Sequence, residues 1–126
     1  MMTPSEFRKV SEALLADVRK GYQTVRPVKH TVFVQKGEGP PGCCALGAAY
    51  VGRTGLIDEL QKWRARGEGT EFAIAQAACA YGGTGRFYQG FAYGFDGIKP
   101  GEGVDAWLGH ELGAAAALEF SPHLPD

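Results

Sequence analysis

Residues 81–97 read Y-G-G-T-G-R-F-Y-Q-G-F-A-Y-G-F-D-G and hold six aromatic residues, six glycines and one arginine. Thr84 follows a pair of glycines and is a residue type that caps helix N-termini, whereas Gly97 is a typical helix stop. Between them, four aromatic residues recur at helical spacing. They are Phe87, Tyr88, Phe91 and Phe95. The segment therefore predicts a helix whose aromatic face belongs to the core.

Glycines recur four residues apart on this helix and on the next predicted one, residues 104–120. They are Gly90, Gly94, Gly109 and Gly113. An interior glycine costs a helix about 0.5–1 kcal/mol relative to alanine, so four of them indicate a geometric need. Small residues at this spacing let two helices approach closely. We expect the two helices to cross tightly within the chain, with self-association through the same glycines as the alternative.

The other helices are predicted from capping residues, hydrophobic period and glycine stops. The predicted helices span residues 3–21, 43–51, 54–67, 70–82, 84–97 and 104–120. The first opens with a capping box from Thr3 to Glu6. Three further threonines are predicted N-caps: Thr54, Thr70 and Thr84. Glycines 52, 67 and 82 are predicted helix stops.

Residues 22–35 change period, because β-branched residues become dense and alternate with other types. This pattern predicts one or two short strands, or a small β-hairpin. We therefore expect a mainly α fold with five or six short helices and a small β element. The length of 126 residues suits a single domain, residues 1–126.

Charge is balanced overall but not along the chain. The net charge is −1, yet residues 1–66 hold 11 Lys/Arg against 6 Asp/Glu, and residues 67–126 hold 2 against 8. The overall balance argues against a nucleic-acid partner, whereas the polarity suits another protein or head-to-tail self-association. In the plainer interpretation, the two halves pack together and neutralise each other. No apolar run approaches the ~20 residues of a membrane span and no secretory segment opens the chain, so we expect a cytoplasmic protein with no membrane partner.

Two adjacent cysteines, Cys43 and Cys44, open a predicted helix. The helix dipole lowers the pKa of a thiol at that position, as a cysteine-dependent enzyme requires. A histidine would then accept the proton, either His110 or His30. The chain has neither C-x-x-C nor H-x-x-x-H spacing, so we expect no metal site, and no cofactor motif is present either. Packing as small apolar residues is the plainer role of both cysteines.

Two groups of residues suggest a ligand or partner surface. Arg86 and Tyr88 lie in the glycine- and aromatic-rich segment, where aromatic rings and an arginine could stack on a small ring compound or on single-stranded nucleic acid. Arg64 and Arg66 form a basic helix end that could contact acidic groups. The plainer interpretations are a core aromatic face and a solvated basic face.

The stretch Cys44-Ala45-Leu46-Gly47-Ala48-Ala49 follows a predicted N-terminal helix and an irregular segment. This arrangement resembles small uncharacterised proteins of phages and bacteria, some of which, from actinobacteria, are grouped as a domain of unknown function. The stretch Gly90–Gly97 also looks like patterns in short phage proteins. The resemblance implies a phage or mobile-element accessory protein, a class that includes inhibitors of bacterial defence systems, and it supplies no catalytic residues. We therefore expect a protein that binds another protein, ahead of an enzyme or a ligand binder.

Overall fold

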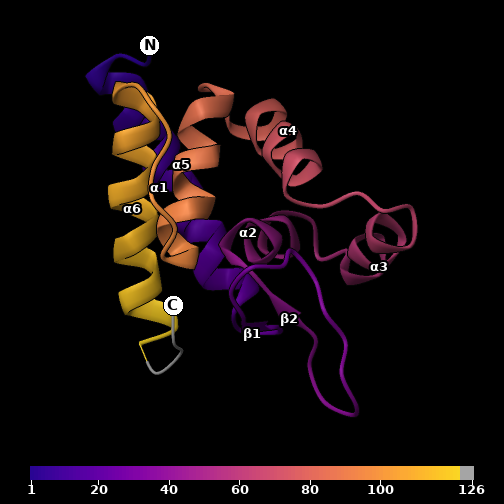
Figure 1. Ribbon diagram of the computed structural model, residues 1–126. Coiled ribbons are helices and arrows are strands. Elements are labelled where there is room, and N and C mark those ends of the chain that lie inside the picture. The colour runs from indigo at the N-terminus through magenta and orange to yellow at the C-terminus, as the bar shows by residue number, and fades with distance from the viewer. Residues whose placement is uncertain (123–126) are drawn as a thin grey trace.

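The computed structural model describes residues 1–122, and this part of the chain forms six helices and one short two-stranded sheet (Figure 1). The helices are α1 (Pro4–Gly21), α2 (Ala45–Thr54), α3 (Ile57–Ala65), α4 (Thr70–Tyr81), α5 (Gly85–Asp96) and α6 (Val104–Phe120). The strands are β1 (Arg26–Pro27) and β2 (Gly42–Cys43). The predicted mainly α fold is confirmed. The last four residues of the predicted domain lie outside the described part.

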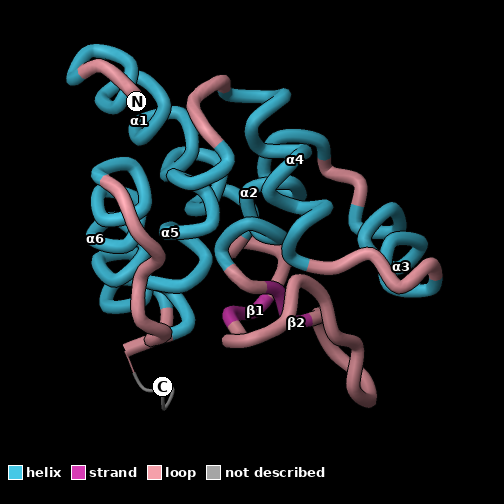
Figure 2. The backbone as a smooth tube through the Cα atoms, turned by 45° about the horizontal axis from the view of Figure 1, so that its top comes forward, coloured by secondary structure: helices cyan, strands magenta, loops and turns pink. Residues whose placement is uncertain are grey.

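The helices surround one core in which α5 is central. Four aromatic side chains of α5 are fully buried there: Phe87, Tyr88, Phe91 and Phe95. Leu14 and Val18 of α1 and Leu60 of α3 join them in the same cluster. In Figures 1 and 2, α6 and α3 lie at opposite ends of the molecule, and α5, α2 and α4 lie between them.

Helix α1 starts where its sequence predicts. The Thr3 hydroxyl oxygen accepts the N–H of Glu6, and the Glu6 carboxylate accepts the N–H of Thr3, both at 3.1 Å. These two bonds satisfy donors that a helix start otherwise leaves unpaired. Pro4 occupies the first turn, where its missing N–H costs nothing.

The β element forms from three segments rather than from a local hairpin. Residues 26–27 pair in parallel with residues 42–43, and Val34 pairs with Gly42 on the other side in an antiparallel bridge. The two arms of the predicted hairpin thus bond to the segment at Gly42 and not to each other. Gly42 suits this position, because a Cβ there would lie 2.6 Å from Val28 Cγ1. Figure 2 shows the strands beneath α2 and the loop that joins them projecting outward.

Several helix boundaries differ from their predictions. Helix α2 begins at Ala45 because the two residues before Cys44 are engaged in the sheet, and it continues through Gly52 to Thr54. Its stop is Gly55, whose φ of 72° is a left-handed conformation that favours glycine.

Of the three threonines predicted as N-caps, only Thr84 has that role. Its hydroxyl oxygen accepts the N–H of Phe87. Thr54 ends α2, and its hydroxyl donates to the Tyr50 carbonyl, while Leu56 is the N-cap of α3. Thr70 is the first residue of α4 and not its cap.

Helices α5 and α6 cross at the four predicted glycines. A Cβ on Gly90 would lie 2.1 Å from the Ala106 carbonyl oxygen, and one on Gly113 would lie 2.1 Å from the Phe91 carbonyl oxygen. Gly94 and Gly109 face the opposite backbone just as closely. Any side chain would force the two backbones apart, so the crossing needs glycine at each of these positions.

Candidate functional site

Burial governs the chemistry of the two adjacent cysteines. Cys43 and Cys44 are both buried. Burial raises the pKa of the Cys44 thiol to about 12, and it also raises the pKa of Cys43. The prediction of a lowered thiol pKa at this helix N-terminus is therefore wrong. Desolvation of the thiolate raises the pKa by more than the helix dipole lowers it. Neither thiol is presented as a nucleophile.

The two candidate histidines are engaged elsewhere. His110 lies on α6, and its Nε2 is 2.8 Å from the Ile98 carbonyl oxygen. His30 has a φ of 69°, and its backbone N–H donates to the Asp96 carboxylate at 2.9 Å. Within residues 1–122, no hydrogen bond joins either imidazole to Cys43 or Cys44. The catalytic pairing of a thiol with His110 or His30 is therefore not assembled.

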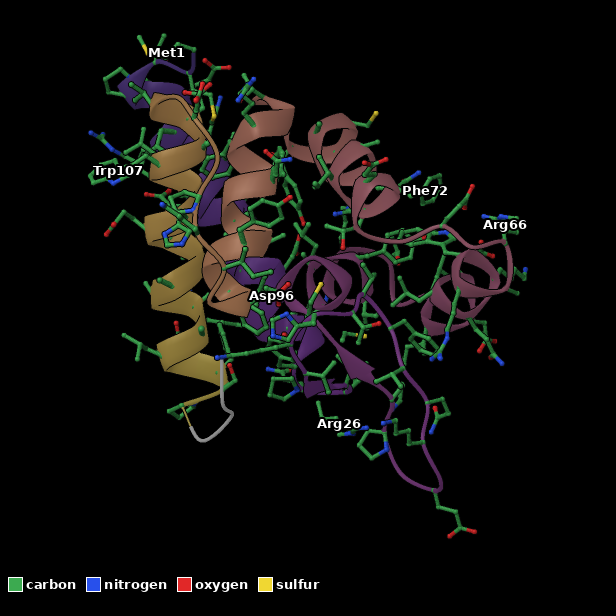
Figure 3. All side chains as sticks on the ribbon, in the orientation of Figure 1. Met1, Arg26, Arg66, Phe72, Asp96 and Trp107 are labelled. Atoms are coloured by element: carbon green, nitrogen blue, oxygen red, sulfur yellow. The ribbon has the colours of Figure 1, made fainter. Side chains whose placement is uncertain are left out.

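Asp96 holds the turn at His30 by accepting its backbone N–H. The carboxylate is partly buried, and burial raises its pKa, while the His30 N–H acts in the opposite direction. Figure 3 shows Asp96 at the end of α5, facing the irregular segment between β1 and β2. In the described part of the chain, no three His, Cys, Asp or Glu side chains are grouped so that they could hold a metal ion.

Four of the six aromatic rings in the glycine- and aromatic-rich segment are buried, and Tyr81 and Tyr93 are half-buried. Tyr88 is fully buried and its hydroxyl donates to the Gly82 carbonyl, so the role predicted for Tyr88 at a ligand surface is wrong. The same helical spacing that predicted α5 places Phe87, Tyr88, Phe91 and Phe95 in the core. Arg86 remains exposed, and its guanidinium donates to the Glu102 carbonyl oxygen at 3.0 Å.

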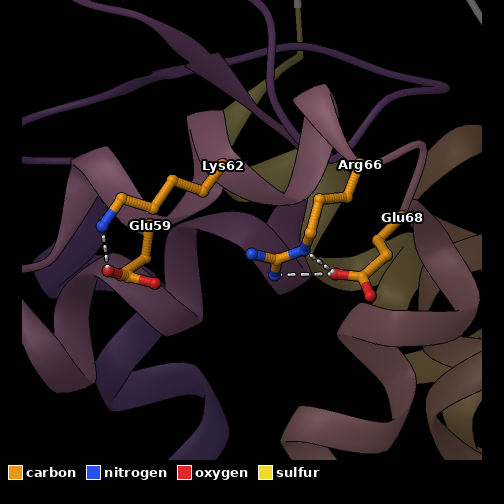
Figure 4. Close-up of polar contacts among 4 residues, drawn as sticks. All are labelled: Glu59, Lys62, Arg66 and Glu68. Atoms are coloured by element: carbon orange, nitrogen blue, oxygen red, sulfur yellow. Dashed lines mark hydrogen bonds and ion pairs between the residues drawn. The ribbon is translucent and has the colours of Figure 1, made fainter.

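The predicted basic helix end is paired locally (Figure 4). Arg66 binds the Glu68 carboxylate through Nε and Nη2, at 3.2 and 2.9 Å. Lys62 pairs with Glu59 at 3.1 Å. Arg64 is exposed but donates to the Phe33 carbonyl oxygen at 3.3 Å. These side chains belong to α3 and the turn after it, at the end of the molecule opposite α6 (Figure 1).

A different surface, on α6, carries exposed apolar side chains. Five positions three or four residues apart are all exposed, and we call them the α6 stripe: Val104, Trp107, Glu111, Ala115 and Leu118. Trp107 is 55% exposed and Leu118 76% exposed. Figure 3 shows Trp107 pointing away from the helices. The opposite side of α6 holds Gly109 and Gly113 against α5.

One sequence pattern in α6 indicates this surface, but the sequence analysis predicted no partner surface on this helix. Residues 112–118 read L-G-A-A-A-A-L, which is apolar on every side of a helix. A helix that is apolar all round is usually covered on all sides. Here α5 packs against the glycine side of α6, and the five stripe positions are left exposed. A row of exposed apolar side chains is a candidate interaction surface.

No family model matches the chain, and neither a curated protein nor a solved structure matches it. Among residues 1–122, no helix is both long enough and apolar enough to cross a membrane. The α6 stripe is thus the surface feature that most needs a functional explanation.

Proposed function

We propose that this protein acts in the cytoplasm by binding another protein through the α6 stripe, as a phage or mobile-element accessory factor would. The observation that carries the proposal is that three large exposed apolar side chains, Val104, Trp107 and Leu118, lie in one row on α6 with Ala115 and Glu111 between them. Single exposed apolar side chains are ordinary on a protein surface, whereas an aligned set is not. The row contains a half-exposed tryptophan, Trp107, and tryptophan is enriched among the residues that dominate binding energy.

The shape of the stripe suits a helix as its partner. Its five members follow at intervals of three, four, four and three residues, so they form one straight row along α6. A helix of this length is about 25 Å long, at roughly 1.5 Å per residue. Apolar residues with this spacing on a partner helix would pack between those of α6, as in coiled coils and helix-in-groove complexes.

The charge of the stripe suggests the chemistry of the partner. Glu111 lies at the centre of the row, and α6 contains no lysine or arginine. A carboxylate covered by a partner is strongly destabilising unless a cation pairs with it. The partner helix should therefore place a lysine or arginine opposite Glu111. A second copy of α6 would bring another glutamate, so the charge favours a different protein over self-association.

The proposal can be tested by site-specific photo-crosslinking. A benzoylphenylalanine that replaces Ala115, in the stripe, should crosslink one protein in an extract of the native cells. The same residue in place of Ala80, an exposed alanine on α4, should not crosslink it. Crosslinks to the same proteins from both positions would contradict the proposal.

Charge reversal then tests the chemistry of the interface with the crosslinked partner. Glu111→Lys should weaken binding roughly tenfold or more, because an attractive pair becomes a repulsive one. Changing the opposing partner cation to glutamate should restore binding. Leu118→Ser should also weaken binding, whereas Leu56→Ser, at an exposed leucine beside α3, should not. Equal effects of the two serine variants would show that the stripe is not the interface.

A further inference from the structure

Helix α3 is attached to the rest of the molecule along one side only. It buries two of its nine side chains, Leu60 and Trp63, and a third, Ile57, is half-buried against the core. A helix this short is marginal in water by itself, because isolated helices need roughly 12–15 residues. Its stability therefore depends on these few contacts. Figure 1 shows α3 at one end of the molecule, apart from α1, α5 and α6.

The contact beneath α3 is mainly aromatic and is incompletely packed. Trp63 meets Tyr50 of α2 and Phe72 of α4 edge to face, with ring centroids 4.5 and 4.8 Å apart. Trp63 also lines a pocket of 240 Å³ between α3 and Phe33. Arg64 reaches the Phe33 carbonyl oxygen at 3.3 Å, from a side chain that is exposed to water. Close packing and buried hydrogen bonds resist local opening, and both are limited here.

Glycines flank α3 on both sides. Gly55 precedes the helix with a φ of 72°, and Gly67 follows it with a φ of 75°. A Cβ on Gly55, Gly67 or Gly69 would meet nothing within 4 Å, so no close contact holds the backbone at these positions. Moving elements turn on a few loop or element-terminal residues that absorb the change in φ and ψ. The two linkers beside α3 have the properties of such hinges.

We infer that α3 is a hinged arm, which swings away from the body of the protein on these two linkers while the crossing of α5 and α6 stays intact. In the closed form the arm covers Tyr50 and Phe72 with its own Leu60 and Trp63. In the open form these apolar groups face water, so the arm hides an aromatic surface at the end of the molecule opposite the α6 stripe. The inference does not depend on the proposed function of that stripe.

Native-state hydrogen exchange of the full chain, followed by NMR at low urea concentrations, tests this inference. The amides of residues 61–65 should share one opening free energy and one urea dependence, both smaller than those of α5. A common value marks the opening of a unit, and a small urea dependence shows that the rest of the chain stays folded. After correction for intrinsic rates, exchange in α3 should be at least about a hundredfold faster than in α5.

Two variants separate the opening of the arm from global unfolding. Gly90→Ala weakens the crossing of α5 and α6 through the collision of its Cβ with the Ala106 carbonyl, and this crossing is present in the closed and the open form. It should speed exchange in α5 about 5- to 150-fold and leave exchange in α3 unchanged. Trp63→Ala weakens the closed form alone, so it should speed exchange in both helices by the same factor.

Three results would overturn the inference. Equal opening free energies in α3 and α5 would show that α3 detaches only when the whole chain unfolds. Acceleration of α3 and α5 by the same factor in Gly90→Ala would show the same. Opening free energies that rise from the ends of α3 to its middle, without any urea dependence, would show fraying of the helix and not a hinged arm. The first and third results need only the natural chain, so a variant that does not fold leaves the test in place.

Discussion

Burial explains why Cys43 and Cys44 differ from the reactive thiols that their position suggests. Cys44 is the N-cap of α2, so the dipole of that helix does favour its thiolate. The desolvation of a fully buried thiolate is the larger effect, and it raises the pKa of Cys44 to about 12. Position in a helix can be predicted from the sequence, but the solvent exposure of a side chain depends on segments far along the chain.

Alkylation of the folded protein should therefore separate the three cysteines. Cys79 is exposed on α4 and should react first with iodoacetamide at pH 8. Cys43 and Cys44 should react at least roughly a hundredfold more slowly, because the protein must open locally before reagent reaches them. Mass spectrometry of the digested protein gives the rate at each site. A Cys43 or Cys44 that reacts faster than Cys79 would instead support the enzyme hypothesis.

At the scale of elements, glycines decide which helices cross. The spacing of four on two successive helices predicted the close approach of α5 and α6, because repetition distinguishes a packing surface from a helix stop. Gly52 is a single glycine and was predicted as a stop, but α2 passes through it. A Cβ on Gly52 would lie 1.9 Å from the Asp17 carbonyl oxygen, so this glycine lets α1 cross α2. A lone glycine fits both roles, and only the tertiary contact distinguishes them.

Alanine substitutions within α5 can measure this crossing. Gly90→Ala should lower the free energy of unfolding by about 1–3 kcal/mol, because its Cβ would collide with the Ala106 carbonyl. Gly85 is the matched control, since its nearest neighbour would be 4.0 Å away, at Ile74. Gly85→Ala should leave the stability unchanged or raise it by at most about 1 kcal/mol. Urea denaturation measures both, and equal effects would contradict the close crossing.

Across the whole molecule, few ion pairs among residues 1–122 join the basic first half of the chain to its acidic second half. Arg19 of α1 pairs with Glu119 of α6 at 2.9 Å, which joins the basic and acidic halves. This pair is exposed, and such pairs contribute only about 0–1 kcal/mol. Lys62 and Arg66 pair instead with acidic residues close by in the sequence, Glu59 and Glu68. The halves are therefore held together by the apolar core, and their charges remain available at the surface.

The sequence could not show which side of α6 remains open, because an apolar residue looks the same whether its own chain or a partner covers it. Within the α6 stripe, Glu111 is the residue that opposes self-association, since two copies of α6 would bring two carboxylates together. Glu111→Leu should therefore make the stripe wholly apolar and convert a monomer into a dimer at micromolar concentrations. Glu71→Leu, on the exposed surface of α4, should leave the protein monomeric. Sedimentation equilibrium measures both variants. If the natural chain is already a dimer that Leu118→Ser dissociates, the occupant of the stripe is a second copy and not another protein.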